Sequence, residues 1–198
     1  MINRKSIIVL VLALVGSQAG AAEVVQFLGQ SVGTTMDAEL TPAQIASAGI
    51  ANPDDYACFR MNMLDPASGS VIGSGVDCLV FHDVPGRVAN SKGLANGRAF
   101  QNLAGDVAVE AVSIFNFGGG DIIVTTGLTS VRPLLEGFGN GGAPARTHIS
   151  GSIPDPSAHS VILAEGAFAG SQGPARVSGA LAIDSNGLFF DCLWILDI

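Results

Sequence analysis

A glycine-rich stretch near the C-terminal end is the feature that most constrains how this chain can fold. Between Ile162 and Ile183, residues 166–179 contain four glycines within fourteen positions, and an apolar run lies on either side. Glycine has no side chain, so it occurs where backbones approach closely or bend sharply. This spacing predicts the corners of a strongly curved β-sheet. We interpret the four glycines as structural: Gly166, Gly170, Gly173 and Gly179.

The first 22 residues have the organisation of a secretory signal peptide. Basic Arg4 and Lys5 precede residues 6–15, a run of ten of which nine are apolar, and small residues follow at 18–22. About ten apolar residues are too few to span a bilayer as a helix. We therefore expect residues 1–22 to be removed and the mature protein to be secreted or periplasmic, with no membrane span after cleavage.

Residues 23–198 are expected to form a single domain. Nothing in the middle of the chain resembles a linker, and a chain of this length can bury about two-thirds of its unfolded surface in one core. Removal of the signal peptide leaves seven basic and seventeen acidic side chains, a formal charge of −10. That balance opposes nucleic acid and anionic lipid as partners.

Helical periodicity is scarce, and short strands separated by Gly, Pro, Asn, Asp and Ser dominate the pattern. One helical turn is expected at 41–48, with Thr41 as N-cap and Pro42 in the first helical position. Turns at 65–66, 118–120 and 186–187 predict antiparallel hairpins. The predicted fold is all-β: a closed antiparallel eight-stranded barrel, mainly up-and-down, with a short N-terminal helical turn and long mouth loops. The predicted strands cover residues 24–28, 56–64, 71–82, 98–103, 107–117, 121–126, 146–153, 160–166, 176–183 and 188–196.

Three cysteines remain after cleavage. Cys58 and Cys78 flank the turn at 65–70, and a hairpin centred there places them nearly opposite each other. In an oxidising compartment the two can form a disulfide, although cross-strand geometry is demanding and three buried free thiols are the alternative. Cys192 lies in an apolar strand and is interpreted as a small buried thiol.

Four charged side chains stand out because the strands around them are otherwise apolar: Arg60, Asp77, Glu110 and Asp191. A buried carboxylate is costly unless it is paired, hydrogen-bonded or protonated, so a partnership of Arg60 with Asp77 across the first hairpin is predicted. In a catalytic interpretation these four residues form the site, with Glu110 or Asp191 as general acid or base. The alternative places them on the solvent face of amphipathic strands or in a structural ion pair.

No metal or organic cofactor is expected. His148 and His159 lie eleven residues apart, and the sequence offers no evident second pair of ligands. The glycines at 118–120 precede a strand and lack a nearby lysine, so they indicate a turn and not a phosphate cradle. Serine and histidine occur without a nucleophile elbow, which opposes a hydrolytic triad.

Three motifs rich in glycine and apolar residues recur along the mature part of the chain. They are Phe59-x-Met61-x-Met63-Leu64-Asp65-Pro66-x-x-Gly69-x-x-x-Gly73-x-Gly75-x-Asp77, then Phe117-Gly118-Gly119-Gly120-Asp121-Ile122 with Thr126-Gly127, and Glu165-Gly166-Ala167-Phe168-Ala169-Gly170-Ser171-x-Gly173-x-Ala175-x-Val177-Ser178-Gly179. Together they resemble the allene oxide cyclase and dirigent-like barrel superfamily, over nearly all of the mature part. In the third motif, Glu165 stands at or near a position where Gly or Thr is frequent, and Ser171 stands where Ala is usual.

The resemblance implies an eight-stranded barrel with an apolar cavity, often in a homodimer or homotrimer. Some members guide the cyclisation or coupling of reactive intermediates without a cofactor. The pocket-specific residues of either enzyme branch have no motif match in this chain, and Phe168 is interpreted as a core or plug residue.

Two functions of different classes follow. The first is a secreted barrel that binds a small apolar or reactive intermediate and steers its cyclisation or coupling, in the manner of a cofactor-independent isomerase. The second is a non-catalytic ligand-binding or structural barrel whose outer face forms an oligomer. The sequence leaves open whether the protein is an enzyme, and it names no ligand. An outer-membrane barrel is disfavoured because aromatic girdles and a terminal aromatic residue are missing from the sequence.

Overall fold

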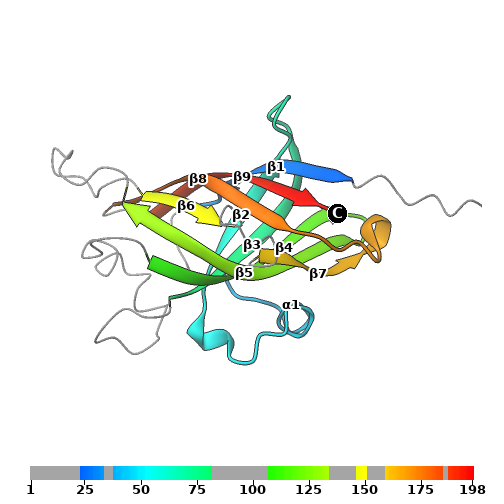
Figure 1. The fold of residues 1–198 in the computed structure, drawn as a ribbon, viewed down its shortest axis with the longest axis horizontal. Helices are drawn as coiled ribbons and strands as arrows, with labels where there is room; N and C mark the ends of the chain where they lie inside the picture. The colour runs from blue at the N-terminus through cyan, green and yellow to red at the C-terminus, as the bar shows by residue number, and fades with distance from the viewer. Residues whose placement is uncertain (1–22, 34–37, 82–106, 134–145, 151–158, 185–186) are drawn as a thin grey trace, which may run out of the picture.

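The described part of the chain forms one curled antiparallel sheet with the shape of a half-barrel, accompanied by one α-helix (Figure 1). The structure is a computed structural model, and it describes residues 23–33, 38–81, 107–133, 146–150, 159–184 and 187–198. The all-β prediction is confirmed for these segments. The predicted signal peptide, the predicted strand at 98–103 and the first residue of the predicted Asn186-Gly187 turn lie outside them.

Most predicted strands are found within a few residues of their expected bounds. The largest difference is at the strand predicted for 121–126, which continues to Pro133. The strands are β1 (Val24–Ser31), β2 (Ala57–Leu64), β3 (Val71–Phe81), β4 (Val107–Gly118), β5 (Asp121–Pro133), β6 (Arg146–Ser150), β7 (His159–Glu165), β8 (Ala175–Asp184) and β9 (Gly187–Asp197).

Strands that follow one another in the chain are mostly neighbours in the sheet, which agrees with the predicted up-and-down topology. The order is β4-β3-β2-β1-β9-β8-β6-β5-β7, and β4 pairs with β5 in addition. β6 and β7 pair with successive parts of β5, since Thr129 faces Ser150 whereas Gly127 faces His159. All of these pairings are antiparallel.

The larger apolar core lies on the inner face of the curled sheet. Side chains alternate between the two faces of a strand, so every second residue of β2 points inward. Aromatic rings fill the centre: Phe115 lies edge-on to Phe27 at 4.8 Å and to Trp194 at 4.9 Å between ring centroids. The β2 residues of this core are Ala57, Phe59, Met61 and Met63.

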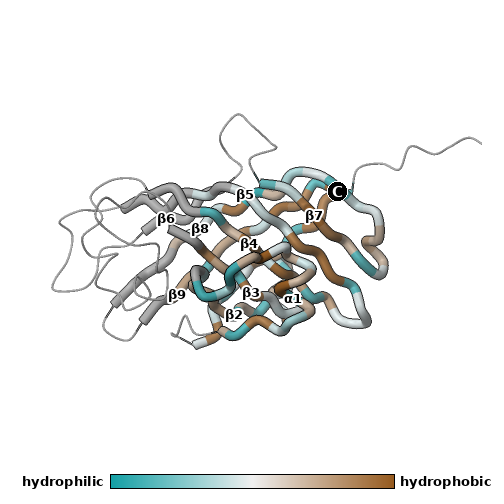
Figure 2. Tube along the Cα trace, turned by 90° about the horizontal axis from the view of Figure 1, so that it is seen from below, coloured by the Kyte–Doolittle hydropathy of each residue, from teal (hydrophilic) through white to brown (hydrophobic). Residues whose placement is uncertain are grey.

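A second core lies on the outer face, beneath the segment that joins β1 to β2. Ala48 and Ile50 pack there against the outward residues of β2 to β5. The segment contains α1 (Pro42–Ser47) and a 3₁₀ turn, η1 (Pro53–Asp55). Figure 1 shows α1 outside the sheet, and Figure 2 shows hydrophobic stretches along the strands around it. Strands β2 to β5 are therefore apolar on both faces.

The predicted cap of α1 is confirmed. The Thr41 side chain accepts a hydrogen bond from the Gln44 backbone N–H at 3.2 Å, and the Gln44 side-chain oxygen accepts one from the Thr41 backbone N–H at 2.8 Å. This reciprocal pair satisfies two of the N–H groups that a helix start leaves without partners. It also fixes the orientation of the Gln44 amide.

The predicted disulfide between Cys58 and Cys78 is confirmed. The two cysteines are direct partners in the β2–β3 pairing, and their side chains meet on the outer face under the α1 segment. Cys192 is free and buried, as expected. The disulfide is compatible with an oxidising, extracytoplasmic compartment.

The glycine-rich stretch joins β7 to β8 and continues into β8. Gly166 begins a 3₁₀ turn, η4 (Gly166–Phe168), and Phe168 packs against Phe117 with 5.0 Å between ring centroids. A side chain at Gly173 would overlap the Asp197 carbonyl, and one at Gly179 would overlap the backbone of β9. The predicted close backbone contacts are therefore present at Gly173 and Gly179, whereas a side chain at Gly170 would meet no other atom within 4 Å.

The glycine contacts predict a clear stability difference between two neighbouring positions of β8. Gly179→Ala places a methyl group against the backbone of β9 at Asp191 and Cys192, so we expect the free energy of unfolding to fall by about 1–3 kcal/mol. Ser178→Ala is the control because Ser178 is exposed on the other face of the same strand. Urea unfolding measures both. Equal stability of the two variants would contradict a close contact at Gly179.

The disulfide closes a loop of 20 residues, which corresponds to a stabilisation of about 3 kcal/mol. We expect the double variant Cys58→Ser, Cys78→Ser to lose about that much on urea unfolding, whereas Cys192→Ala keeps the bond. Titration of unreduced, denatured wild-type protein should find one thiol, and Cys192→Ala should show none. Three thiols in the wild type would show that the bond does not form.

Candidate functional site

A row of polar side chains crosses the apolar inner face of the sheet. Asp77 on β3, Ser113 on β4 and Thr125 on β5 are consecutive partners in the strand pairing, so they share one face. All three are buried, Asp77 with 1% of its surface exposed. We call these residues, together with His159 on β7, the inner polar cluster. Buried polar groups of this kind are costly unless hydrogen-bonded, so their grouping marks a candidate site.

Asp77 is the one charged residue among the buried positions of the described chain. The Ser113 hydroxyl donates a 2.6 Å hydrogen bond to Asp77 Oδ1. Burial raises the pKa of Asp77 to about 7, against the lowering effect of the hydrogen bonds from Ser113 and from the Cys78 backbone. A carboxyl group with this pKa can give or take a proton near neutral pH.

His159 and Thr125 form the other half of the inner polar cluster. His159 Nε2 lies 3.0 Å from Thr125 Oγ1, and the imidazole ring stands edge-on to Trp194 at 5.9 Å between centroids. Burial lowers the pKa of His159 to about 4, so the ring is neutral at physiological pH. A neutral imidazole contributes a hydrogen-bonding group here and no positive charge.

Two polar atoms on the inner face have no hydrogen-bond partner within the described chain: Asp77 Oδ2 and Trp194 Nε1. The buried thiol of Cys192 belongs to the same face. Burial, with the charges of Asp77 and Asp191, raises the pKa of Cys192, so it stays a thiol and is no nucleophile. The chemistry available on this face is therefore hydrogen bonding and proton transfer by Asp77.

The predicted partnership of Arg60 with Asp77 is wrong. Residues directly opposite each other in an antiparallel pair share a face, and Arg60 faces Val76 while Asp77 faces Phe59. Arg60 is consequently exposed on the outer face, whereas Asp77 is buried on the inner one. The expected register, with Arg60 opposite Ser74 or Gly75, is off by at least one residue.

Glu110 and Asp191 lie on the outer face, away from the inner polar cluster. Glu110 shares its face with Val112 and Ile114 of the outer core, and the Tyr56 hydroxyl donates to Glu110 Oε1 at 3.5 Å. Asp191 is exposed between two inward residues of β9. The structure thus places Asp77 on the opposite face of the sheet from Arg60, Glu110 and Asp191, and the catalytic roles proposed for all four stay predictions.

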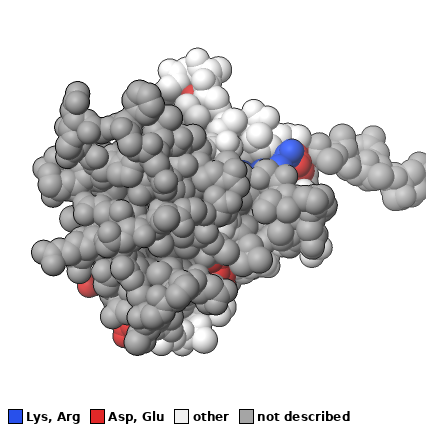
Figure 3. Space-filling model, turned by 60° about the vertical axis from the view of Figure 1, so that its left-hand side comes forward, with Lys and Arg blue, Asp and Glu red and all other residues white. Residues whose placement is uncertain are grey.

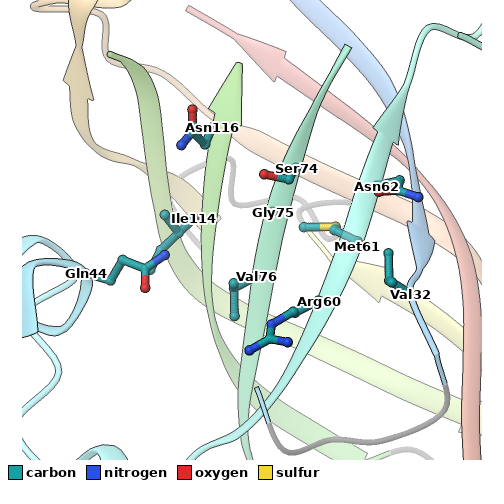
Figure 4. Close-up of a pocket in the computed structure, with 10 residues that line it drawn as sticks. All are labelled: Val32, Gln44, Arg60, Met61, Asn62, Ser74, Gly75, Val76, Ile114 and Asn116. Atoms are coloured by element: carbon teal, nitrogen blue, oxygen red, sulfur yellow. The ribbon is translucent and has the colours of Figure 1, made fainter. Parts of the chain in front are cut away.

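An outer groove lies beside α1, where the α1 segment stops covering β2 to β4 (Figure 4). Its volume is about 320 Å³. Two cross-strand rows line it, with Met61 and Gly75 between them, and the wall is completed by Val32 and Gln44. One row consists of Asn62, Ser74 and Asn116, and the other of Arg60, Val76 and Ile114.

Hydrogen bonds fix the direction of two of the three side-chain amides in the outer groove, those of Asn116 and Gln44. Asn116 Oδ1 accepts from the Gly118 backbone N–H at 2.8 Å, and Gln44 Oε1 accepts from the Thr41 backbone N–H. A backbone N–H can only donate, so each amide uses its oxygen in this bond and keeps its NH₂ group. Figure 4 shows the Gln44 amide nitrogen on the side of Ile114.

The described residues contain no group of three or more His, Cys, Asp or Glu side chains arranged to hold a metal. None of the helices in these segments has the length and apolar content needed to cross a bilayer. Comparison of the chain with family models, curated proteins and solved structures finds no match. The resemblance to the allene oxide cyclase and dirigent-like superfamily therefore stays a prediction.

Sequence reasoning found Asp77 but missed Ser113, Thr125 and His159. Ser and Thr are ordinary strand residues and carry no signal of their own. His159 follows a polar segment in the sequence, although it lies two residues before buried Val161 and so shares its face. The alternation of side chains along β4 would have identified Ser113 as an inward residue if the sequence had shown which face of β4 points inward. It did not, because β4 is apolar on both faces.

The titration of Asp77 predicts how stability depends on pH. Its pKa rises from 3.8 unfolded to about 7 folded, so this group costs stability progressively as pH increases from about 4 to 7. His159 has the opposite effect: its folded pKa is lowered, and the stability present above pH 6.5 is lost as pH falls toward 4. The two slopes partly cancel in the wild type.

Replacing Asp77 removes one of these slopes. We expect the stability of Asp77→Asn relative to the wild type to increase by about 4 kcal/mol from pH 4 to pH 7, because a pKa difference of one between the folded and unfolded states corresponds to about 1.4 kcal/mol. Urea unfolding at each pH measures this, with Asp191→Asn as the exposed control. A stability difference that is constant with pH would show that Asp77 does not titrate as a buried group.

Proposed function

We propose that this chain is a secreted or periplasmic barrel that binds a small, largely apolar molecule against Asp77. The observation that carries the proposal is that Asp77 Oδ2 and Trp194 Nε1, two buried polar atoms of the inner face, have no hydrogen-bond partner among the described residues. A buried polar group without a partner is uncommon and is often satisfied by a bound molecule. A ligand with one oxygen acceptor supplies such a partner, and its apolar part matches the surrounding rings.

We further propose that the curled sheet closes into an eight-position barrel. The pairing of β4 with β5 supports closure, because β4 stands at one end of the strand order and β5 next to the other. β6 and β7 then share one position beside β5. The resemblance to the dirigent-like superfamily supports the same barrel and a homodimer or homotrimer.

The chemistry open to Asp77 is steering of a reactive intermediate without a cofactor. In its protonated form Asp77 donates a hydrogen bond to a carbonyl or ether oxygen of the ligand, while Ser113 holds the other carboxyl oxygen. Such a donor in a dry site polarises the bonded oxygen and stabilises charge that develops on it. The apolar walls hold the ligand in the folded shape that ring closure or coupling requires.

A non-catalytic structural barrel is the second candidate, and the aromatic packing favours it. Phe27, Phe115 and Trp194 are fully buried and in ring contact. Rings packed this closely contribute the stability of a core without any ligand. The two candidates differ in whether a molecule occupies the face beside Asp77.

Extraction of the purified, oxidised protein distinguishes the two candidates. We expect mass spectrometry to find a small apolar molecule with an oxygen group in the wild type and in the control Asp191→Asn. Asp77→Leu, which keeps similar size but cannot hydrogen-bond, should reduce its molar yield at least about tenfold.

Trp194 is the only tryptophan, so its fluorescence reports on the inner face. Adding back the extracted molecule should change this fluorescence in the wild type and much less in Asp77→Leu. An empty wild-type extract, or equal yields from wild type and Asp77→Leu, would overturn binding at Asp77 and favour the structural barrel. Circular dichroism confirms that each variant is folded.

A further inference from the structure

We propose that the outer groove is a second binding site, specific for a small organic carboxylate with a short apolar tail. It lies on the opposite face of the sheet from Asp77 and includes no residue of the inner polar cluster. The proposal therefore does not depend on the function assigned to the inner face. It rests on the kind of hydrogen-bonding groups that the groove exposes and on their charge.

The groove offers several hydrogen-bond donors, and two of its residues, Asn62 and Ser74, can both donate and accept. The side-chain oxygens of Gln44 and Asn116 already accept from backbone N–H groups, so the NH₂ groups of these amides remain for a ligand. Arg60 adds a guanidinium group, which can only donate. The donors of Gln44, Asn116 and Arg60 favour a ligand that accepts hydrogen bonds at several atoms.

The positive charge of Arg60 also favours a ligand that accepts hydrogen bonds, in particular an anion. Arg60 is exposed and makes no ion pair with any part of the chain that the structure describes, whereas Arg176 pairs with Asp197. None of the described residues that line the groove is acidic. Figure 3 shows a different face of the molecule. Among the described residues visible there, acidic side chains are scattered and basic ones are rare. An arginine with no acidic partner among the described residues favours an anion, and its planar fork matches a carboxylate in a bidentate manner.

The apolar residues of the groove indicate that the anion has a tail. Val32 is 47% exposed at the wall, and Val76 and Ile114 lie in the same row as Arg60. A simple inorganic anion has nothing to place against these side chains. A volume of about 320 Å³ is at the lower end of the range for small-molecule sites. A ligand with its carboxylate at Arg60 and a short hydrocarbon tail along Val76 would contact both the charged and the apolar residues of the groove.

Calorimetric titration of the oxidised protein with butanoate, hexanoate and octanoate tests the proposal. Each carboxylate is compared with its primary amide, which has nearly the same shape and no charge. We expect the carboxylates to bind at least about tenfold more tightly than the amides, because charge-assisted hydrogen bonds are about twice as strong as neutral ones. Affinity should also increase with tail length.

Substitutions locate the binding on the outer face. Arg60→Gln should weaken binding about tenfold or more, and Arg60→Lys should weaken it less because it keeps the charge and loses the fork. Ser74→Asp, at an exposed position beside Asn62 and Asn116, should abolish binding by repulsion while Arg60 is intact. Arg176→Gln is the matched control and should leave the affinity unchanged.

Four outcomes would overturn the proposal: equal binding of carboxylate and amide, equal binding of inorganic phosphate, no effect of Arg60→Gln, or loss of binding in Asp77→Leu with Arg60→Gln unaffected. The last outcome would place the carboxylate on the inner face. Because the extraction experiment uses Asp77→Leu and this titration uses Arg60→Gln, failure at one site is distinguishable from failure at the other.

Discussion

The structure depends on strands that bury both of their faces. From β2 to β5, inward residues build the larger core around Trp194, and outward residues build the smaller one under Ala48 and Ile50. Burial of apolar surface is the main favourable contribution to folding, and here a single layer of backbone serves two cores. The α1 segment is thus as much a part of the fold as the sheet, because without it the outer core would face water.

The sequence predicts the strands well and their faces poorly, for one physical reason. Turns carry strong local signals, such as the glycines at 118–120, and these signals placed β4 and β5 correctly at their shared end. Which face points inward depends on the alternation of polar and apolar residues, and β4 has apolar residues on both faces. Consequently Glu110 and Asp77 were indistinguishable as candidates, although only Asp77 is on the inner face. No sequence pattern predicts the outer groove, because the groove forms where the α1 segment no longer covers strands β2 to β4.

The two candidate sites use polarity in opposite ways. On the inner face, a single carboxyl group stands in an apolar environment that raises the pKa of Asp77, so its protonation state is sensitive to whatever lies beside it. On the outer face, the Arg60 guanidinium lies among neutral polar and apolar side chains. The first arrangement suits recognition of one neutral oxygen, and the second suits an anion. We therefore propose that the two faces of one sheet recognise two different classes of small molecule.

The Cys58–Cys78 bond has a consequence for this discrimination. A strand that slips by one residue against its neighbour moves all of its side chains to the opposite face. In the β2–β3 hairpin such a slip would turn Arg60 toward the aromatic core or Asp77 toward water. The disulfide joins two residues that must lie opposite each other on the same face, so it excludes the slipped hairpin. The Cys58–Cys78 disulfide under α1 thus holds the hairpin in the register that keeps Arg60 on the outer face and Asp77 on the inner face.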